Sequence, residues 1–157
     1  MTHPAKILVI DDDASVRKVL AMALEDEGYT VDTAENGGEA IRKSNANFYN
    51  LALIDIRLPD MEGTRLLADM KDTTPKMVKI IVTGYPGLQN AVESVNKGAD
   101  AYIVKPFKME DLLKAVREHL KRQEEAKRYG EEKVKEFIET RATELEKERL
   151  SPFRVRH

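Results

Sequence analysis

The stretch that decides the fold is Ile7-Leu8-Val9-Ile10-Asp11-Asp12-Asp13, an apolar run that stops at three consecutive aspartates. Four apolar residues in a row suit a strand buried on both faces and are far too few to cross a bilayer. Acids that directly follow such a strand lie at its carboxyl end, where open parallel α/β sheets bind ligands. The stretch therefore predicts the first strand of a parallel sheet, with a polar site at its end.

Strand and helix patterns alternate along the first 120 residues, which predicts repeated βα units. The five predicted strands are Lys6–Ile10, Thr30–Thr33, Leu51–Ile54, Lys79–Val82 and Ala101–Val104. The second of these is the most polar, which places it near an edge of the sheet. The predicted helices are Ser15–Glu27, Gly38–Ser44, Thr64–Lys71, Leu88–Asn96 and a segment from Met109 onward.

Beyond Lys108 the chain has no proline until Pro152 and is rich in Glu, Lys, Arg, Ala and Leu, which predicts one long helix or two. A glycine in a helix interior costs about 1 kcal/mol relative to alanine, so we expect a kink or break near Gly130. An apolar stripe resumes beyond it, at Val134, Phe137, Ile138 and Leu145. We expect it to bind a partner helix, most simply in a homodimer; the alternative is that it folds back on its own domain.

Composition narrows the possible chemistry. There is no cysteine and there are three scattered histidines, which removes disulfides, thiolate catalysis and a histidine metal cluster. Residues 121–149 hold nine basic and nine acidic residues, so we expect no nucleic-acid contact from this segment. No secretory signal precedes the first strand and no apolar run is long enough to span a membrane, so we expect a cytoplasmic protein.

Polar side chains stand at the ends of the predicted strands: Asp11, Asp12 and Asp13 after the first, then Asp55, Thr83 and Lys105. If the strands are adjacent, these groups meet in one crevice. Several carboxylates held together repel one another unless a cation neutralises them, and hard oxygen ligands suit Mg²⁺. A hydroxyl and an ammonium opposite the metal can contact phosphoryl oxygens, which leaves one carboxylate as the acceptor.

The chain resembles the receiver domain of two-component response regulators. Four separated motifs carry the resemblance: Asp11-Asp12, Asp55 with Pro59 and Gly63, Thr83-Gly84, and Lys105-Pro106. The resemblance covers about residues 5–120. It implies a flavodoxin-like α/β fold with five parallel strands in the order 2-1-3-4-5, five helices and, here, an extended C-terminal helix.

The resemblance also implies residue roles at the metal and acceptor positions. Asp55 is then the phosphoacceptor and a metal ligand, Asp12 is a direct Mg²⁺ ligand, and Asp11 acts beside it through water. The backbone carbonyl of Arg57 completes the protein's share of the metal shell.

Further roles come from the last two strands. Thr83 is implied to be the switch hydroxyl that closes onto the phosphoryl group, and Lys105 the cation that contacts it. Tyr102 is implied to be the aromatic residue that changes rotamer on activation, although an aromatic on this strand is more often a core residue. The resemblance also implies a cis bond between Lys105 and Pro106.

Two other functions fit some of the same residues. A haloacid-dehalogenase-type phosphohydrolase would use Asp11 as nucleophile and Asp13 as general acid with Mg²⁺, but that hypothesis leaves Asp55 and its loop unexplained. A receiver that has lost phosphorylation and serves as an adaptor is disfavoured, because every chemical residue is present. Capping of the following helix is a plain alternative for Asp13 alone.

The sequence therefore predicts a receiver domain over residues 1–120 and a charged helical extension with a short basic tail over 121–157. We expect Asp55 to take a phosphoryl group from a sensor histidine kinase, in a regulatory role in which the domain catalyses only its own phosphorylation and dephosphorylation. The chain could be a stand-alone receiver, a segment of a longer regulator, or part of a hybrid kinase.

Overall fold

The computed structural model describes residues 3–85 and 87–150, and it contains one five-stranded parallel sheet. The strands are β1 (Lys6–Ile10), β2 (Thr30–Ala34), β3 (Leu51–Ile54), β4 (Val78–Thr83) and β5 (Ala101–Val104). Their order is β2-β1-β3-β4-β5, which confirms the predicted topology. The polar strand β2 lies at an edge, as its composition predicted, and the apolar strands β1, β3 and β4 fill the centre.

Five helices connect and follow the strands: α1 (Ala14–Asp26), α2 (Gly37–Ala46), α3 (Gly63–Asp69), α4 (Leu88–Asn96) and α5 (Met109–Leu150). In α1, α2 and α3 the structure moves the predicted ends by one or two residues. At the starts of α1 and α2 the cause is a side-chain cap, from Asp13 and Asn36. Asp13 accepts hydrogen bonds from the backbone N–H groups of Ser15 and Val16, so α1 begins one residue earlier than predicted.

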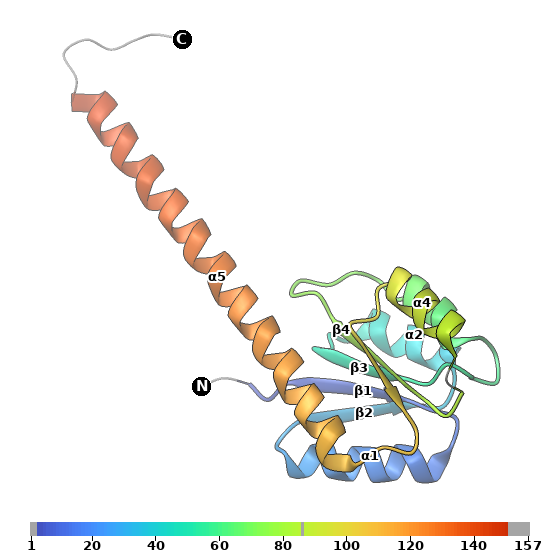
Figure 1. Ribbon diagram of the computed structural model, residues 1–157. Helices are drawn as coiled ribbons and strands as arrows, with labels where there is room; N and C mark the ends of the chain where they lie inside the picture. Colours follow the sequence, from blue (N-terminus) through green and yellow to red (C-terminus); the bar gives the residue numbers. More distant parts are fainter. Residues whose placement is uncertain (1–2, 86, 151–157) are drawn as a thin grey trace. The chain divides into compact units, whose positions relative to one another are not determined.

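The sheet separates two apolar cores, and Figure 1 shows helices on both of its faces. On one face, α1 supplies Leu20 and Leu24 and the first part of α5 supplies Leu112 and Val116. On the other face, α2 and α3 pack through residues that include Ala40, Leu66 and Leu67. Because both faces are covered, β1 and β3 are buried almost end to end, and the open place for a ligand is the edge where the strands end.

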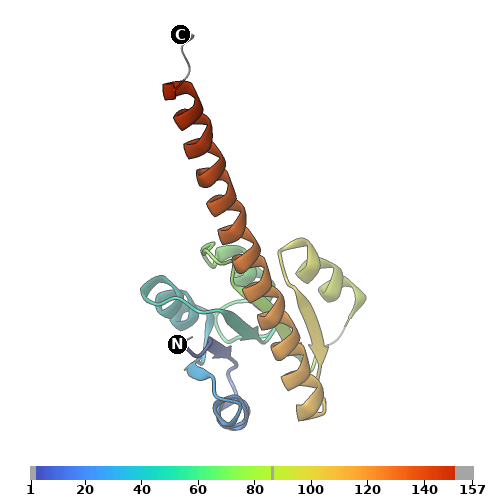
Figure 2. The ribbon, with the colours of Figure 1, turned by 90° about the vertical axis from the view of Figure 1, so that its left-hand side faces the viewer.

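The chain divides into two compact units, Met1–Lys121 and Arg122–His157. The helix α5 belongs to both and runs without interruption from Met109 to Leu150 (Figure 2). The expected kink at Gly130 is therefore wrong: the i,i+3 and i,i+4 ion pairs along the segment support a regular helix that tolerates one glycine. The expected basic tail is Arg149–His157; its first two residues end α5, and residues 151–157 lie outside the described residues.

None of the helices within the described ranges is long and apolar enough to cross a membrane.

Candidate functional site

Three charged side chains from three strand ends meet at the carboxyl edge of the sheet. Asp11 follows β1, Asp55 follows β3 and Lys105 follows β5. The Lys105 Nζ donates to Asp11 Oδ2 at 2.7 Å and lies 3.4 Å from Asp55 Oδ2. Residues separated by up to 94 positions in the sequence thus form one ionic cluster, as the strand-end pattern predicted.

The electrostatics of this cluster favour the charged form of Lys105 and penalise the charged form of Asp55. Burial raises the pKa of Asp55, and the charge of Asp11 raises it further, while Lys105 works in the opposite direction. Burial by itself lowers the pKa of Lys105, but its hydrogen bond to Asp11 and the two carboxylate charges outweigh burial and leave the pKa above its usual value. The carboxylates of Asp11 and Asp55 therefore carry more negative charge than the single ammonium of Lys105 neutralises.

Asp12 adds a third carboxylate to the site. Oxygen atoms of Asp11, Asp12 and Asp55 all lie within 4.8 Å of one another, with Asp12 exposed and the other two buried. Carboxylate oxygens at one exposed edge are the donor set that Mg²⁺ takes, since it keeps several waters and binds one or two carboxylates directly. The residues present fit a magnesium ion. Asp13 is not part of this group of carboxylates, because its side chain caps the start of α1.

A tight loop between β3 and α3 brings backbone atoms close to Asp55. The N–H of Arg57 donates to Asp55 Oδ1 at 3.2 Å, so the Arg57 backbone lies beside the carboxylate. The loop then turns back through a bridge between Arg57 and Glu62, and the Gly63 N–H donates to the Ile56 carbonyl. The Arg57 guanidinium lies 4.0 Å from the centroid of the Tyr85 ring.

Thr83 and Tyr102, the two proposed switch residues, lie on the adjacent strands β4 and β5. Thr83 is the last residue of β4; it is fully buried, and its Oγ1 accepts from the Tyr85 N–H at 3.0 Å. Tyr102 lies on β5, partly buried against the core that α2 and α3 cover. Its hydroxyl is the buried side-chain polar atom that lacks a hydrogen-bond partner among the described residues. The bond between Lys105 and Pro106 is cis, as expected.

Comparison with known proteins identifies this architecture. The family model of the response regulator receiver domain matches residues 7–117. The chain belongs to the response regulator receiver domain family. It is 34% identical over 143 residues to the transcriptional regulatory protein GlrR of Escherichia coli, covering 90% of this chain and 32% of GlrR.

Solved structures agree with this assignment. A CheY-like receiver domain protein from Methanospirillum hungatei has a TM-score of 0.75 and 48% identity, over 78% of this chain and 98% of that one. The Thermotoga maritima response regulator TrrA in complex with Mg(2+)-BeF has a TM-score of 0.66 and 33% identity, over 73% of this chain and 98% of that one. The receiver here serves a regulatory role in a two-component phosphorelay. The chain spans about a third to a half of the length of the curated relatives it matches.

The receiver also uses residues that the sequence analysis did not single out. Arg17, on α1, donates from Nη1 to the Asp11 carbonyl at 2.8 Å and so holds the start of the acidic loop. Asp60, in the β3–α3 loop, accepts from the first N–H groups of α2, at Gly37 (2.8 Å) and Gly38 (2.9 Å). Its position directly after Pro59 was visible in the sequence, but nothing there indicates its partners.

The Asp60 hydrogen bonds predict a pH-dependent loss of stability. The Gly37 and Gly38 N–H groups lower the pKa of Asp60, so this carboxylate stabilises the fold above its unfolded pKa, and that stabilisation is lost as pH falls through the folded pKa. We expect Asp60→Asn to lower the free energy of unfolding at pH 7 by about 1 kcal/mol, a value kept small because Asp60 is exposed. Urea unfolding from pH 7 to 3.5 should show the difference from wild type shrinking below about pH 4.

The control for this prediction is Asp69→Asn, which removes an exposed carboxylate that makes an i,i+4 pair with Arg65. It should change stability by no more than about 0.5 kcal/mol. Equal effects of the two variants at pH 7 would contradict the stabilising role of the hydrogen bonds from Gly37 and Gly38 to Asp60.

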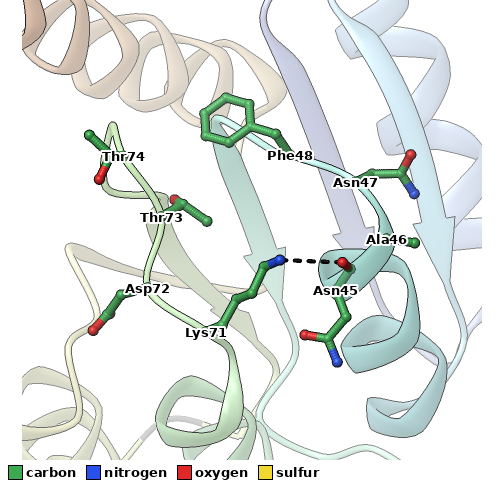
Figure 3. A pocket seen from close by; sticks show the side chains of 8 residues that line it. All are labelled: Asn45, Ala46, Asn47, Phe48, Lys71, Asp72, Thr73 and Thr74. Atoms are coloured by element: carbon green, nitrogen blue, oxygen red, sulfur yellow. Dashed lines mark hydrogen bonds between the residues drawn. The ribbon is translucent and has the colours of Figure 1, made fainter.

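A pocket of about 390 Å³ has a lining that includes none of the residues of the ionic cluster. Figure 3 shows the residues that line it. Residues 45–48 and 71–74 line it, and the Lys71 Nζ donates to the Asn45 carbonyl at 3.3 Å across it. These segments precede β3 and β4, so the pocket lies at the amino ends of the strands, whereas the carboxylates follow the carboxyl ends. It takes no part in the chemistry of the acidic site.

Proposed function

We propose that Asp55 accepts a phosphoryl group from the phosphohistidine of a sensor histidine kinase in a Mg²⁺-dependent reaction. One observation carries the proposal: a buried carboxylate lies between two further carboxylates and a lysine at the carboxyl edge of the sheet. That arrangement provides an acceptor, ligands for a cation and a positive group for phosphoryl oxygens in one place. Capping explains Asp13, but it leaves this convergence of Asp11, Asp12 and Asp55 without a reason.

The transfer forms one bond and breaks one. An Asp55 carboxylate oxygen attacks phosphorus while the bond from phosphorus to the histidine nitrogen breaks, and the electron pair of that bond stays on the imidazole. Bound Mg²⁺ supplies positive charge that offsets the carboxylates and the phosphoryl oxygens. Asp12 and Asp11 hold that ion, with Asp55 and the Arg57 carbonyl. Lys105, already within hydrogen-bonding range of Asp55, turns its ammonium to a phosphoryl oxygen.

The switch uses the neighbouring strands. Thr83 gives up its hydrogen bond with the Tyr85 N–H and turns its hydroxyl toward the phosphoryl group. The Tyr102 hydroxyl, which has no hydrogen bond in its buried position, has little to lose from a change of rotamer, so the ring can follow Thr83. A cytoplasmic location is a further prediction of the sequence.

The experiment for this function is intact-mass analysis after treatment with acetyl phosphate. We expect one phosphoryl adduct with Mg²⁺ present and none with a chelator. The variant Asp11→Asn distinguishes a receiver, with Asp55 as acceptor, from a phosphohydrolase, with Asp11 as nucleophile. If Asp11→Asn is phosphorylated only in part and a higher Mg²⁺ concentration restores the full adduct, Asp55 is supported as the acceptor. Complete loss in Asp11→Asn together with a full adduct on Asp55→Asn would favour the phosphohydrolase.

Substitution of Asp12 and of Asp13 should change the free energy of unfolding in opposite directions when the protein is free of metal. Asp12 makes no hydrogen bond among the described residues and adds charge to a crowded site, so Asp12→Ala should raise the free energy of unfolding by up to about 1 kcal/mol. Asp13 caps α1 through two N–H groups, so Asp13→Ala should lower it by about 1 kcal/mol. Thermal melts with and without Mg²⁺ measure both effects. Of these two variants, only Asp13→Ala should gain stability from Mg²⁺. A melting temperature that falls by several degrees in metal-free Asp12→Ala would contradict the repulsion argument.

We also propose that the helix beyond Lys121 joins two copies of the chain. Val134, Phe137, Ile138 and Leu145 are 49–71% exposed, an unusual number of large apolar side chains on one helix face. Fully burying such a side chain contributes about 1.5–3 kcal/mol, and a second copy has the same face to offer.

Association should depend on that face alone. Ile138→Glu puts a charge into it and should weaken dimerisation at least tenfold in analytical ultracentrifugation. The control Thr143→Glu adds the same charge to the opposite side of the helix and should leave the dimer intact. A monomeric wild-type protein at tens of micromolar would refute the association.

A further inference from the structure

The helix beyond Lys121 carries its apolar residues in a pattern that sets the direction of its partner. At 100° per residue, Val134, Phe137, Ile138 and Leu145 fall on one side of α5. Gly130 lies on the same side, one turn before Val134, and a side chain built there meets nothing within 4 Å. By contrast Tyr129, on the far side, already has the Lys133 ammonium over its ring at 5.4 Å.

Charged residues interrupt this face, and they decide between the two ways of pairing helices. Lys127, Glu131, Arg141 and Glu148 lie on it together with the apolar residues. In a parallel pair in register, each of these residues meets its own copy, so four layers would put like charges face to face. Like charges at close range destabilise a helix pair, and they serve as specificity devices in coiled coils.

An antiparallel pair removes these conflicts. We propose that two copies of this segment associate antiparallel, with the centre of the contact between Phe137 and Ile138. The proposal rests on the association proposed above and adds its direction. In this register Lys127 lies level with Glu148 of the second copy, so opposite charges approach. Arg141, which pairs with Glu144 of its own helix at 3.1 Å, lies beside Val134 of the second copy instead of its own copy.

The same register also matches shapes. Gly130 lies level with Leu145 of the second copy, which fills the open space above the glycine with a large side chain. Phe137 lies level with Ile138 of the second copy, and the two-fold axis repeats both contacts. The glycine that costs stability in an isolated helix thus allows close approach in the pair. The segment 121–149 has nine basic and nine acidic residues, so no net charge opposes its association with itself.

The direction has a structural consequence. A parallel pair attaches both receiver domains to the same end of the helix pair, whereas an antiparallel pair attaches them to opposite ends.

Disulfide cross-linking tests the direction directly, because the chain has no cysteine of its own. The variants Lys127→Cys and Glu148→Cys place single thiols at levels equally far from the proposed centre, and leave the apolar residues in place. Mixing the two full-length variants before oxidation should give a cross-linked heterodimer in high yield. Each variant alone should give little, since its two thiols lie about 32 Å apart along the axis at 1.5 Å per residue. The matched pair Glu132→Cys and Thr143→Cys lies at symmetric levels on the opposite face and should not cross-link.

Each outcome decides between specific models. Cross-linking of Lys127→Cys with itself, without the mixed product, would establish a parallel pair and overturn the proposal. A dimer by sedimentation in which neither combination cross-links would place the contact on another face and also overturn it. A monomer would overturn the association and its direction together. Phosphorylation by acetyl phosphate, measured on the same variants, reports the receiver function separately.

Discussion

Acetyl phosphate and Mg²⁺ should add no phosphoryl group to Asp55→Asn, whereas the wild-type protein gains one. The expected loss is roughly a hundredfold or more in rate, because the amide of asparagine is a far poorer nucleophile than a carboxylate oxygen. Asparagine has nearly the same shape as aspartate, so the change removes the reacting group and leaves the β3–α3 loop in place. Intact-mass analysis over time measures the result, and a full adduct on the variant would refute the assignment.

The loss has to be separated from unfolding, and the electrostatics of the site allow this. Burial and Asp11 raise the pKa of Asp55, so its charged form is penalised in the folded protein at neutral pH. Asp55→Asn removes that charge, and Lys105 keeps Asp11 at 2.7 Å as its partner. We therefore expect the metal-free variant to be at least as stable as wild type in urea unfolding. Asp60→Asn, an exposed acid in the same loop, serves as the matched control and should still be phosphorylated.

The sheet was predictable from the sequence because its strands are short, apolar and buried on both faces. Ile7–Ile10 and Leu51–Ile54 are four residues long, too short for buried helices, and the acids after them mark the edge of the sheet. Strand order, in contrast, came from the resemblance to receivers, since periodicity does not distinguish one arrangement of parallel strands from another. The structure agrees with both inferences.

The contacts that hold the site were less predictable. The pairing of Lys105 with Asp11 depends on strand positions in space, and the hydrogen bonds from Gly37 and Gly38 to Asp60 join a loop to a helix 22 residues away. Neither leaves a local pattern in the sequence. The expected kink at Gly130 was wrong for a related reason. Helix propensity gives only the cost of the glycine itself, whereas the ion pairs between neighbouring turns on both sides stabilise a continuous helix.

Where the β3–α3 loop meets α3, Gly63 is the position at which we expect a substitution to lower the free energy of unfolding most. A Cβ at Gly63 would collide with the backbone carbonyl oxygen of Asp55 and would lie 2.9 Å from the Cα of Ile56. Backbone atoms cannot turn aside as a side chain can, so Gly63→Ala must push α3 away from the end of β3. We expect a loss of about 3 kcal/mol or more in the free energy of unfolding, at the upper end of overpacking costs.

The same displacement moves the acceptor, so Gly63→Ala should also weaken Mg²⁺ binding at least tenfold in calorimetry, at a temperature where the variant is still folded. Gly84→Ala is the matched control: it follows Thr83 at the same edge of the sheet, but a Cβ there meets nothing within 4 Å. It should change stability by no more than about 0.5 kcal/mol, since no close contact opposes the added methyl group. If Gly63→Ala stayed within 1 kcal/mol of wild type and bound Mg²⁺ normally, the close approach of α3 to Asp55 would have no part in holding the acceptor.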